Sequence, residues 1–463
     1  AALGAPARSA KSGQTTSDEP QYLLSAISLF EDLDLDISDE LAEERYRDFH
    51  AADLPQQTQP RPDGSRISPH DPLLPVVLAA PTAAGGWLGA RLAMATMAGV
   101  LAALTAWVAV VRFGVSTRWA VLVVGGLSVT APLVAYGSQL YPELPAALVV
   151  MTGVAALTGP LGRRGQAVAA LSVVALPWLA VKYTPVAAAL AVAAVVLLAR
   201  RGDGRRAGVL VGVLAVAGVA YLWFHQGVYG GWTAYASGDH FVDGELLALG
   251  TDPDPGGRAY RLAGLLTDRD FGLVAWAPAY LLVVAAVVAF VRARPQGWAI
   301  VVGPLAVGWL NATFVAESMH DWSWPGRQVV VVLPLAVLVT AWWIDRVRAA
   351  RLPFALLTAV ALFLWAWLQV EIAARGTSFS LAVDFHRTDN PLYGLWTAVR
   401  PDHRNPSAST GVVAVLWIAV LGLFAWWGHR SVRPRDVVHG DQDQLGLPNT
   451  GRTHRLSATV EER

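Results

Sequence analysis

The sequence predicts an all-α, polytopic membrane protein, and three observations support this fold class. Of the 463 residues, 54% are hydrophobic and 15% are charged, whereas a soluble protein carries about 25% charged residues. Apolar runs recur along most of the chain at lengths that fit a hydrocarbon core about 30 Å thick. Arginine residues gather in every second connection between these runs, as expected for membrane helices of fixed orientation.

The apolar runs predict eleven visible transmembrane helices. They cover residues 87–111, 118–136, 143–159, 166–181, 184–199, 208–224, 272–291, 298–315, 328–345, 353–371 and 411–427. The chain begins Ala-Ala-Leu-Gly-Ala-Pro, which we interpret as the end of an earlier apolar segment, so that a missing first helix would make twelve. A cleaved signal peptide would leave a similar end.

The arginine pattern predicts the orientation of these helices. The basic connections and the tail carry Arg112, Arg118, Arg163, Arg164, Arg200, Arg201, Arg205, Arg206, Arg292, Arg294, Arg346, Arg348, Arg351, Arg430, Arg433 and Arg435. By the positive-inside rule they are cytoplasmic. The long loops 8–86, 225–271 and 372–410 and the turn 316–327 are then extracytoplasmic.

This pattern divides the chain into three parts. Residues 1–86 form the first extracytoplasmic loop, residues 87–427 form the transmembrane domain, and the polar tail 428–463 is cytoplasmic and disordered. Arginine outnumbers lysine, since only Lys11 and Lys182 are lysines. Together with the heavy use of Ala, Val and Gly, this indicates a bacterial source, and therefore a multi-pass protein of the bacterial plasma membrane.

Composition also excludes several functions. The net charge is zero, so that nothing favours a nucleic-acid partner. The chain has no cysteine, which excludes disulfides, thiolate metal sites and cysteine nucleophiles. No glycine-rich phosphate loop follows a strand, so that no nucleotide-binding domain is predicted.

An acidic pair, Asp18 and Glu19, precedes Pro20 at the start of an amphipathic segment, residues 23–30. The pair could cap that segment as a helix, because acidic residues and proline favour the first turn. The apolar stripe of the segment instead predicts an interfacial helix lying in the membrane surface. The two carboxylates would then sit where a lipid head group and a water-soluble acceptor can meet.

Six short segments carry a family resemblance. They are SDEPQYLL at 17–24, SLFEDLDL at 28–35, SPHDPLLP at 68–75, YPELP at 141–145, LPWLAVKY at 176–183 and GLLTDRDFGL at 264–273. They resemble the GT-C superfamily of membrane glycosyltransferases, and within it the bacterial relatives of the dolichyl-phosphate-mannose–protein mannosyltransferases. The sequence departs from the family pattern at Asp71, where a small residue or proline is expected.

The resemblance implies GT-C architecture and transfer of a sugar of the mannose or arabinose type. The donor would be a polyprenyl-phosphate sugar, and the acceptor an extracytoplasmic glycan, lipid or protein. An inverting displacement needs one carboxylate to take the proton of the acceptor hydroxyl. Because neighbouring helical residues point in different directions, we expect Asp18 to be the base and Glu19 to support it.

A phosphate leaving group needs cationic partners. Lys182, Arg327 and Arg269 all fall on the predicted extracytoplasmic side and are the candidates for binding the donor phosphate. Lys182 could instead be a snorkelling interfacial lysine, and Arg269 could be held in local salt bridges by its acidic neighbours.

Aromatic and histidine side chains are candidates for binding sugar or acceptor. Trp322 and Trp324 could stack on a sugar or a guanidinium, although tryptophans at span ends also serve as membrane anchors. His320 lies in the same turn, and His70 in the first loop. A divalent cation, Mg²⁺ or Mn²⁺, could be held by Asp18 and Glu19 with His70.

Glu143 and Glu317 stand at outer ends of predicted spans, where an ionisable group is either functional or simply interfacial. Two other functions remain open. A transporter or lipid flippase would place charges at the bilayer midplane and show two similar halves, and neither feature is seen. A non-catalytic membrane scaffold would tolerate replacement of Asp18.

Overall fold

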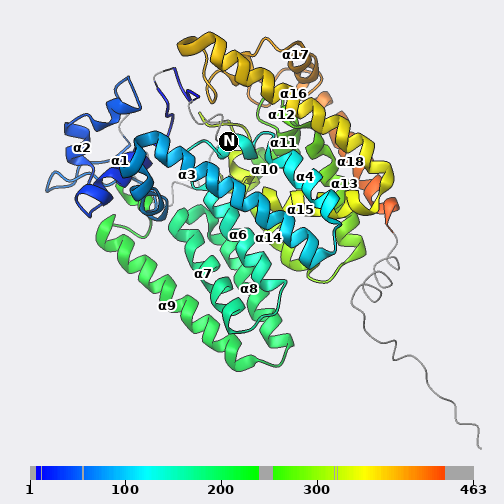
Figure 1. Ribbon diagram of the computed structural model, residues 1–463, viewed down its shortest axis with the longest axis horizontal. Helices are drawn as coiled ribbons and strands as arrows, with labels where there is room; N and C mark the ends of the chain where they lie inside the picture. Colours follow the sequence, from blue (N-terminus) through cyan, green and yellow to red (C-terminus); the bar gives the residue numbers. More distant parts are fainter. Residues whose placement is uncertain are drawn as a thin grey trace, which may run out of the picture.

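The computed structural model describes residues 7–11, 13–54, 57–238, 254–316, 319–320 and 322–432. Within these ranges the chain is helical, with isolated β-bridges and no strand, so that the predicted all-α class is confirmed. Figure 1 shows the helices gathered in one bundle, with α9 at one edge and α16 at the opposite edge.

Among the described residues, twelve longer helices build the bundle. They are α1 (Glu19–Glu31), α3 (Leu73–Phe113), α4 (Thr117–Ser128), α6 (Glu143–Leu157), α7 (Arg163–Leu179), α8 (Thr184–Arg200), α9 (Gly204–Val228), α13 (Leu281–Ala293), α14 (Trp298–Phe314), α15 (Leu333–Arg346), α16 (Arg351–Arg375) and α18 (Thr410–Ser431).

Shorter helices lie in the connections. The α-helical ones are α2 (Ser38–Ala42), α5 (Leu133–Tyr136), α10 (Pro255–Arg258), α11 (Arg261–Thr267), α12 (Leu273–Trp276) and α17 (Pro391–Ala398). The 3₁₀ turns are η2 (Arg45–Asp48), η3 (Val181–Tyr183), η4 (Ala234–Ser237), η7 (Pro278–Tyr280), η8 (Arg327–Val329), η9 (Arg348–Ala350), η10 (Gly376–Ser378) and η11 (Phe385–Arg387).

Each of the eleven predicted runs is helical, but several have different ends. The first helix, α3, starts at Leu73 rather than at residue 87 and has a kink with non-helical backbone at Gly85 and Gly86. The run 118–136 is divided into α4 and α5, and the run 272–291 into α12, η7 and α13. Proline explains both breaks, because Pro132 and Pro278 cannot donate to a preceding helical turn.

Five helices are long and apolar enough to cross a membrane by length and composition. These are Leu73–Phe113, Val181–Arg200, Gly204–Val228, Arg348–Ser378 and Thr410–Ser431, among the residues that the structure describes. The apolar helices Glu143–Leu157, Pro278–Ala293 and Trp298–Phe314 are shorter.

The four segments predicted to share one side of the membrane meet at one end of the bundle, here called the loop end. Contacts join them at Gln59–Ser237 (3.0 Å, backbone), Arg8–Leu381 (2.8 Å, backbone) and Trp324–Phe385 (ring centroids 5.3 Å). Helix α1 packs against α3 at this end, with Leu23 and Leu24 fully buried. The candidate site residues are therefore brought together by loops that lie far apart in sequence.

Candidate active site

A chain of four alternating charges lies at the loop end. Arg327 donates from Nη2 to Asp18 Oδ2 (2.6 Å) and from Nε to Glu143 Oε1 (2.9 Å). Lys182 Nζ donates to the same Glu143 oxygen (2.6 Å). The structure thus brings together three predicted site residues, Asp18, Lys182 and Arg327, around a fourth, Glu143.

Each of the four side chains is presented at the end of a helix. Asp18 immediately precedes α1, and Glu143 is the first residue of α6, following Pro142. Lys182 lies in η3, where the chain turns from α7 into α8. Arg327 opens η8 directly after Gly326, whose φ of 84° is a left-handed conformation that favours glycine.

Burial differs along this chain of charges. The side chain of Glu143 is fully buried, whereas those of Arg327, Asp18 and Lys182 are 11%, 22% and 23% exposed. The two cations and the Asp18 carboxylate thus keep some exposed surface, while Glu143 is the buried partner of both cations. One Glu143 oxygen, Oε2, has no hydrogen-bond partner among the described residues.

Asp18 is ionised in this setting. Burial by itself would raise the pKa of Asp18, but Arg327 and His70 outweigh it and hold the pKa well below its ordinary value. The side chain is not a helix cap, because it makes no capping hydrogen bond to α1. Asp18 thus occupies the N-cap position of α1, but its carboxylate is bound to Arg327 instead of to the helix.

Aromatic rings surround the charges. The Arg327 guanidinium stacks over the ring of Tyr141 at 4.2 Å, and the Tyr141 hydroxyl donates to the Thr16 carbonyl (3.1 Å). Lys182 Nζ lies 5.4 Å from the Tyr183 ring. These contacts fix the direction of the cations, and the YPELP segment supplies both Tyr141 and Glu143.

His70 lies beside Asp18, with Nε2 3.8 Å from Oδ2. Its ring packs against Tyr22 with centroids 4.5 Å apart, and its Nδ1 is 2.8 Å from Ser68 Oγ. His70 is therefore part of the Asp18 group.

Asp71, the departure from the family pattern, is buried and joins three segments. Its Oδ1 accepts from the Tyr221 hydroxyl (2.8 Å) and contacts His225 Nε2 (2.9 Å), and its Oδ2 accepts from the Val181 amide (2.9 Å). Asp71 thereby links the loop that carries His70 to the turn that carries Lys182. Nothing in the local sequence indicated this role, because its partners lie 110 to 154 positions away.

Glu19 has a different set of partners from Asp18. Its carboxylate is fully buried and accepts from the backbone amides of Thr16 (2.9 Å) and Leu140 (2.9 Å), and Arg91 lies 3.8 Å away. Burial raises the pKa of Glu19, and Arg91 offsets only part of that effect. Arg91 was not singled out in the sequence, although an arginine inside an apolar run is a recognisable signal.

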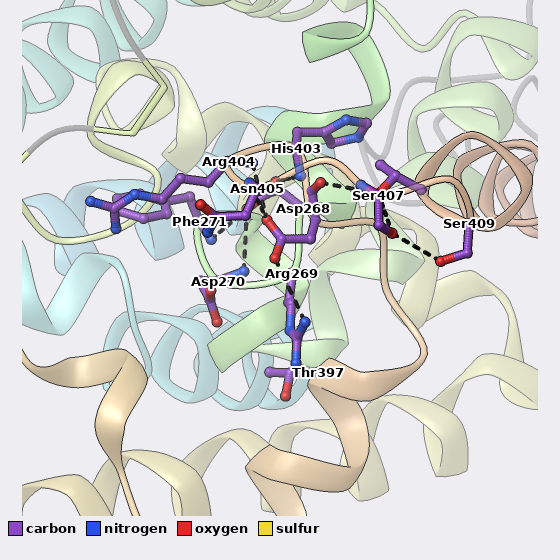
Figure 2. Close-up of polar contacts among 12 residues, drawn as sticks. Asp268, Arg269, Asp270, Phe271, Thr397, His403, Arg404, Asn405, Ser407 and Ser409 are labelled. Atoms are coloured by element: carbon purple, nitrogen blue, oxygen red, sulfur yellow. Dashed lines mark hydrogen bonds and ion pairs between the residues drawn. The ribbon is translucent and has the colours of Figure 1, made fainter.

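A second polar group at the loop end surrounds Asp268 (Figure 2). Asp268 accepts from the amides of Phe271 (2.9 Å) and His403 (3.2 Å), and His320 Nε2 lies 3.4 Å from its Oδ2. Burial tends to raise the pKa of Asp268, but His320 and these amides together lower it. Arg269 forms an ion pair with Asp402 (3.6 Å). Arg269 and His320 thus belong to this group rather than to that of Asp18.

The two predicted tryptophans have different surroundings. Trp322 is 63% exposed and borders a pocket of about 360 Å³. Other residues lining the pocket are Asp270, Phe271, Phe385, His386 and Arg404. Trp324 is 1% exposed and packs against Trp276 and Trp365. Of the remaining candidates, Glu317 lies outside the described residues.

No protein-family model and no curated protein matches this sequence. Its structure is similar to the crystal structure of ArnT from Cupriavidus metallidurans bound to undecaprenyl phosphate, with a TM-score of 0.52 and 14% identity over 92% of this chain and 73% of that chain. The chain shares the fold of ArnT. The GT-C-like architecture predicted from the sequence is thereby confirmed. ArnT in the apo state gives a TM-score of 0.48 and 13% identity, over 92% and 72% of the two chains.

Proposed function

We propose that this protein is a GT-C glycosyltransferase that takes a sugar from a polyprenyl-phosphate donor. The observation that carries the proposal is the chain Asp18–Arg327–Glu143–Lys182, which offers two cations and an accessible carboxylate at the loop end. The fold supports it, because ArnT, a structure with the same fold, was solved with undecaprenyl phosphate. The sugar is of the mannose or arabinose type, and the acceptor is a glycan, lipid or protein outside the bacterial plasma membrane.

Arg327 and Lys182 bind the donor phosphate. Both already donate to one carboxylate oxygen, Glu143 Oε1, so that their donors converge on a single point. A phosphate that binds beside Glu143, on the exposed side of the two cations, accepts charge-assisted hydrogen bonds from both, which are the strong kind. The same two cations then stabilise the phosphate as it leaves.

Asp18 is the general base. The acceptor hydroxyl oxygen attacks the anomeric carbon, the bond from that carbon to the phosphate oxygen breaks, and the hydroxyl proton passes to Asp18. The configuration at the carbon inverts. Because Arg327 keeps the pKa of Asp18 low in the free protein, Asp18 becomes a stronger base once the donor phosphate draws the guanidinium away.

The acceptor approaches from the Trp322 side. Trp322 and Arg327 belong to the same turn, five positions apart, so that their Cα atoms lie within about 18 Å of each other. An exposed indole beside polar side chains is a suitable surface for a sugar ring. His70 and His320 would contact the transferred sugar and the acceptor from the two polar groups.

Asp18 and Glu19 do not fit a Mg²⁺ or Mn²⁺ ion in this arrangement. The Asp18 carboxylate is held by a guanidinium, and both Glu19 oxygens accept backbone amides. No step of the reaction is therefore assigned to a metal ion.

The decisive experiment incubates the purified protein with radiolabelled polyprenyl-phosphate mannose or arabinose and a cell-envelope acceptor fraction. Label that leaves the lipid supports the proposal. In proteoliposomes, label that crosses the bilayer while still attached to its lipid would indicate a flippase instead. Neither release nor crossing would favour a scaffold.

A further inference from the structure

The connection between α1 and α2 is strongly acidic. Residues 31–43 contain seven acidic and no basic side chains: Glu31, Asp32, Asp34, Asp36, Asp39, Glu40 and Glu43. Arg45 makes two hydrogen bonds to Glu31 (2.9 and 2.8 Å) and lies 3.8 Å from Glu43. Arg45 therefore pairs with the acidic residues at the two ends of the segment, and the five between them lie apart from it.

Two of the middle carboxylates hold the turn together. Asp34 Oδ1 accepts from Ser28 Oγ (2.8 Å) and from the Asp36 amide (3.0 Å). Asp36 Oδ1 accepts from the amides of Ser38 (3.0 Å) and Arg66 (2.8 Å). Protein donors thus satisfy both side chains.

Asp32, Asp39 and Glu40 remain. Each contributes a carboxylate oxygen, and these oxygens all lie within 4.8 Å of one another. Glu40 is only 2% exposed, and neither of its carboxylate oxygens has a hydrogen-bond partner among the described residues. A buried carboxylate without a donor, placed against two further carboxylates, is unfavourable as an anion, so that it either takes up a proton or binds a cation.

We propose that Asp32, Asp39 and Glu40 bind a divalent cation of the calcium type. The donors are all carboxylate oxygens, which hard cations prefer, and no imidazole or thiolate is present to favour zinc. Calcium accepts six to eight oxygens in irregular geometry and can use carboxylates as bidentate ligands. Asp32 and Asp39 are exposed, so that water can complete the coordination.

The ion would join the end of α1 to the start of α2. Helix α1 has 13 residues, so that the ion lies about 20 Å along the helix axis from Asp18. The site is thus separate from the proposed catalytic group and stabilises the loop end. It does not depend on the proposed transferase activity.

The test uses the full-length chain purified in detergent and freed of divalent ions with a chelator. We expect calcium to raise the melting temperature by several degrees, because a ligand that binds only the folded state stabilises it. Equilibrium dialysis with ⁴⁵Ca²⁺ should give one ion per chain. The double variant Asp39→Asn/Glu40→Gln should lose both effects.

Asp53→Asn is the matched control, because Asp53 is an exposed carboxylate of the same loop that pairs with Arg47 (2.6 Å). It should keep the full calcium response. Glu40→Gln alone should melt no lower than the wild type without calcium, since it removes an unpaired buried charge, yet it should lose the calcium shift. If Glu40→Gln does not fold, Asp32→Asn/Asp39→Asn provides the same test at exposed positions. A wild type without a calcium shift, or a double variant that keeps it, would overturn the proposal.

Discussion

Arg327 donates a 2.6 Å hydrogen bond to the carboxylate of Asp18, which precedes it by 309 positions in the chain. The same guanidinium holds Glu143, to which Lys182 is also bound. In the free protein each of these charges therefore has a protein partner. The phosphate of the donor must compete with these partners, and this competition underlies the predictions for Asp18→Asn and Lys182→Met.

Asp18→Asn should abolish sugar transfer while the protein remains folded. The amide oxygen of asparagine can still accept from Arg327, but asparagine cannot take a proton. General-base catalysis contributes about 10²- to 10⁴-fold, so that turnover should fall by at least about 100-fold. Transfer of radiolabel to the acceptor measures it, and normal turnover would refute the assignment of the base.

Glu19→Gln is the comparison for this experiment. In the wild type the Glu19 carboxylate is fully buried and accepts hydrogen bonds from two backbone amides. The variant should lower the melting temperature and the yield, whereas turnover per folded molecule should change far less than in Asp18→Asn.

The stability contributed by Asp18 should be insensitive to pH near neutrality. The folded pKa lies below the ordinary value, so that the contribution is fully present above the unfolded pKa of about 3.9 and is lost as the pH falls through the folded pKa. The difference in melting temperature between wild type and Asp18→Asn should stay constant from about pH 5 to 8 and shrink below about pH 4. If the difference in melting temperature between the two proteins fell with a midpoint near pH 6, the pairing of Asp18 with Arg327 would be contradicted.

Lys182→Met should weaken donor binding. A hydrogen bond to a charged group contributes about 1.5–3 kcal/mol, which corresponds to a KM for the lipid donor raised about 10- to 150-fold. Arg269→Met is the matched control, because Arg269 pairs with Asp402 in the second polar group. Equal increases in KM for the two variants would show that the phosphate contacts both groups.

Asp71→Asn should destabilise the protein and shift the position of Lys182. In the variant, an NH₂ group replaces one carboxylate oxygen. This NH₂ group is itself a donor, and it faces the donor that the lost oxygen accepted, either the Val181 amide or the Tyr221 hydroxyl. We expect a loss of about 1–3 kcal/mol, measured by thermal unfolding. The donor KM should also rise, because the Val181 amide adjoins Lys182. Tyr221→Phe removes one bond only and should show a smaller loss of stability with the KM unchanged.

Replacing Trp322 should affect acceptor binding, whereas replacing Trp324 should affect stability. Trp322→Ala should raise the KM for the acceptor with little change in melting temperature, because the indole is 63% exposed beside the pocket. Trp324→Ala should instead cost about 3–5 kcal/mol of stability, because Trp324 is 1% exposed. Acceptor titrations and thermal scans on both variants measure these effects, and an unchanged acceptor KM in Trp322→Ala would remove Trp322 from the acceptor site.

Local sequence patterns were sufficient for the class of fold and for the positions of its helices. Apolar runs about the length of a bilayer form helices wherever they occur, because a backbone in an apolar environment must satisfy its own hydrogen bonds. The ends of these helices were harder to place. Helix α3 begins at Leu73, 14 residues before the predicted start, and continues through a kink at Gly85 and Gly86, and α4 ends before Pro132.

The sequence by itself determined an all-α membrane protein with chemically capable residues gathered in certain loops. Only the tertiary structure decided which of those residues act together. In the folded chain Asp18 forms an ion pair with Arg327, Glu19 with Arg91, and Arg269 with Asp402. The physical reason is that helix formation is governed by neighbours in sequence, whereas ion pairs form between side chains from distant segments whose positions are fixed only when the helices pack.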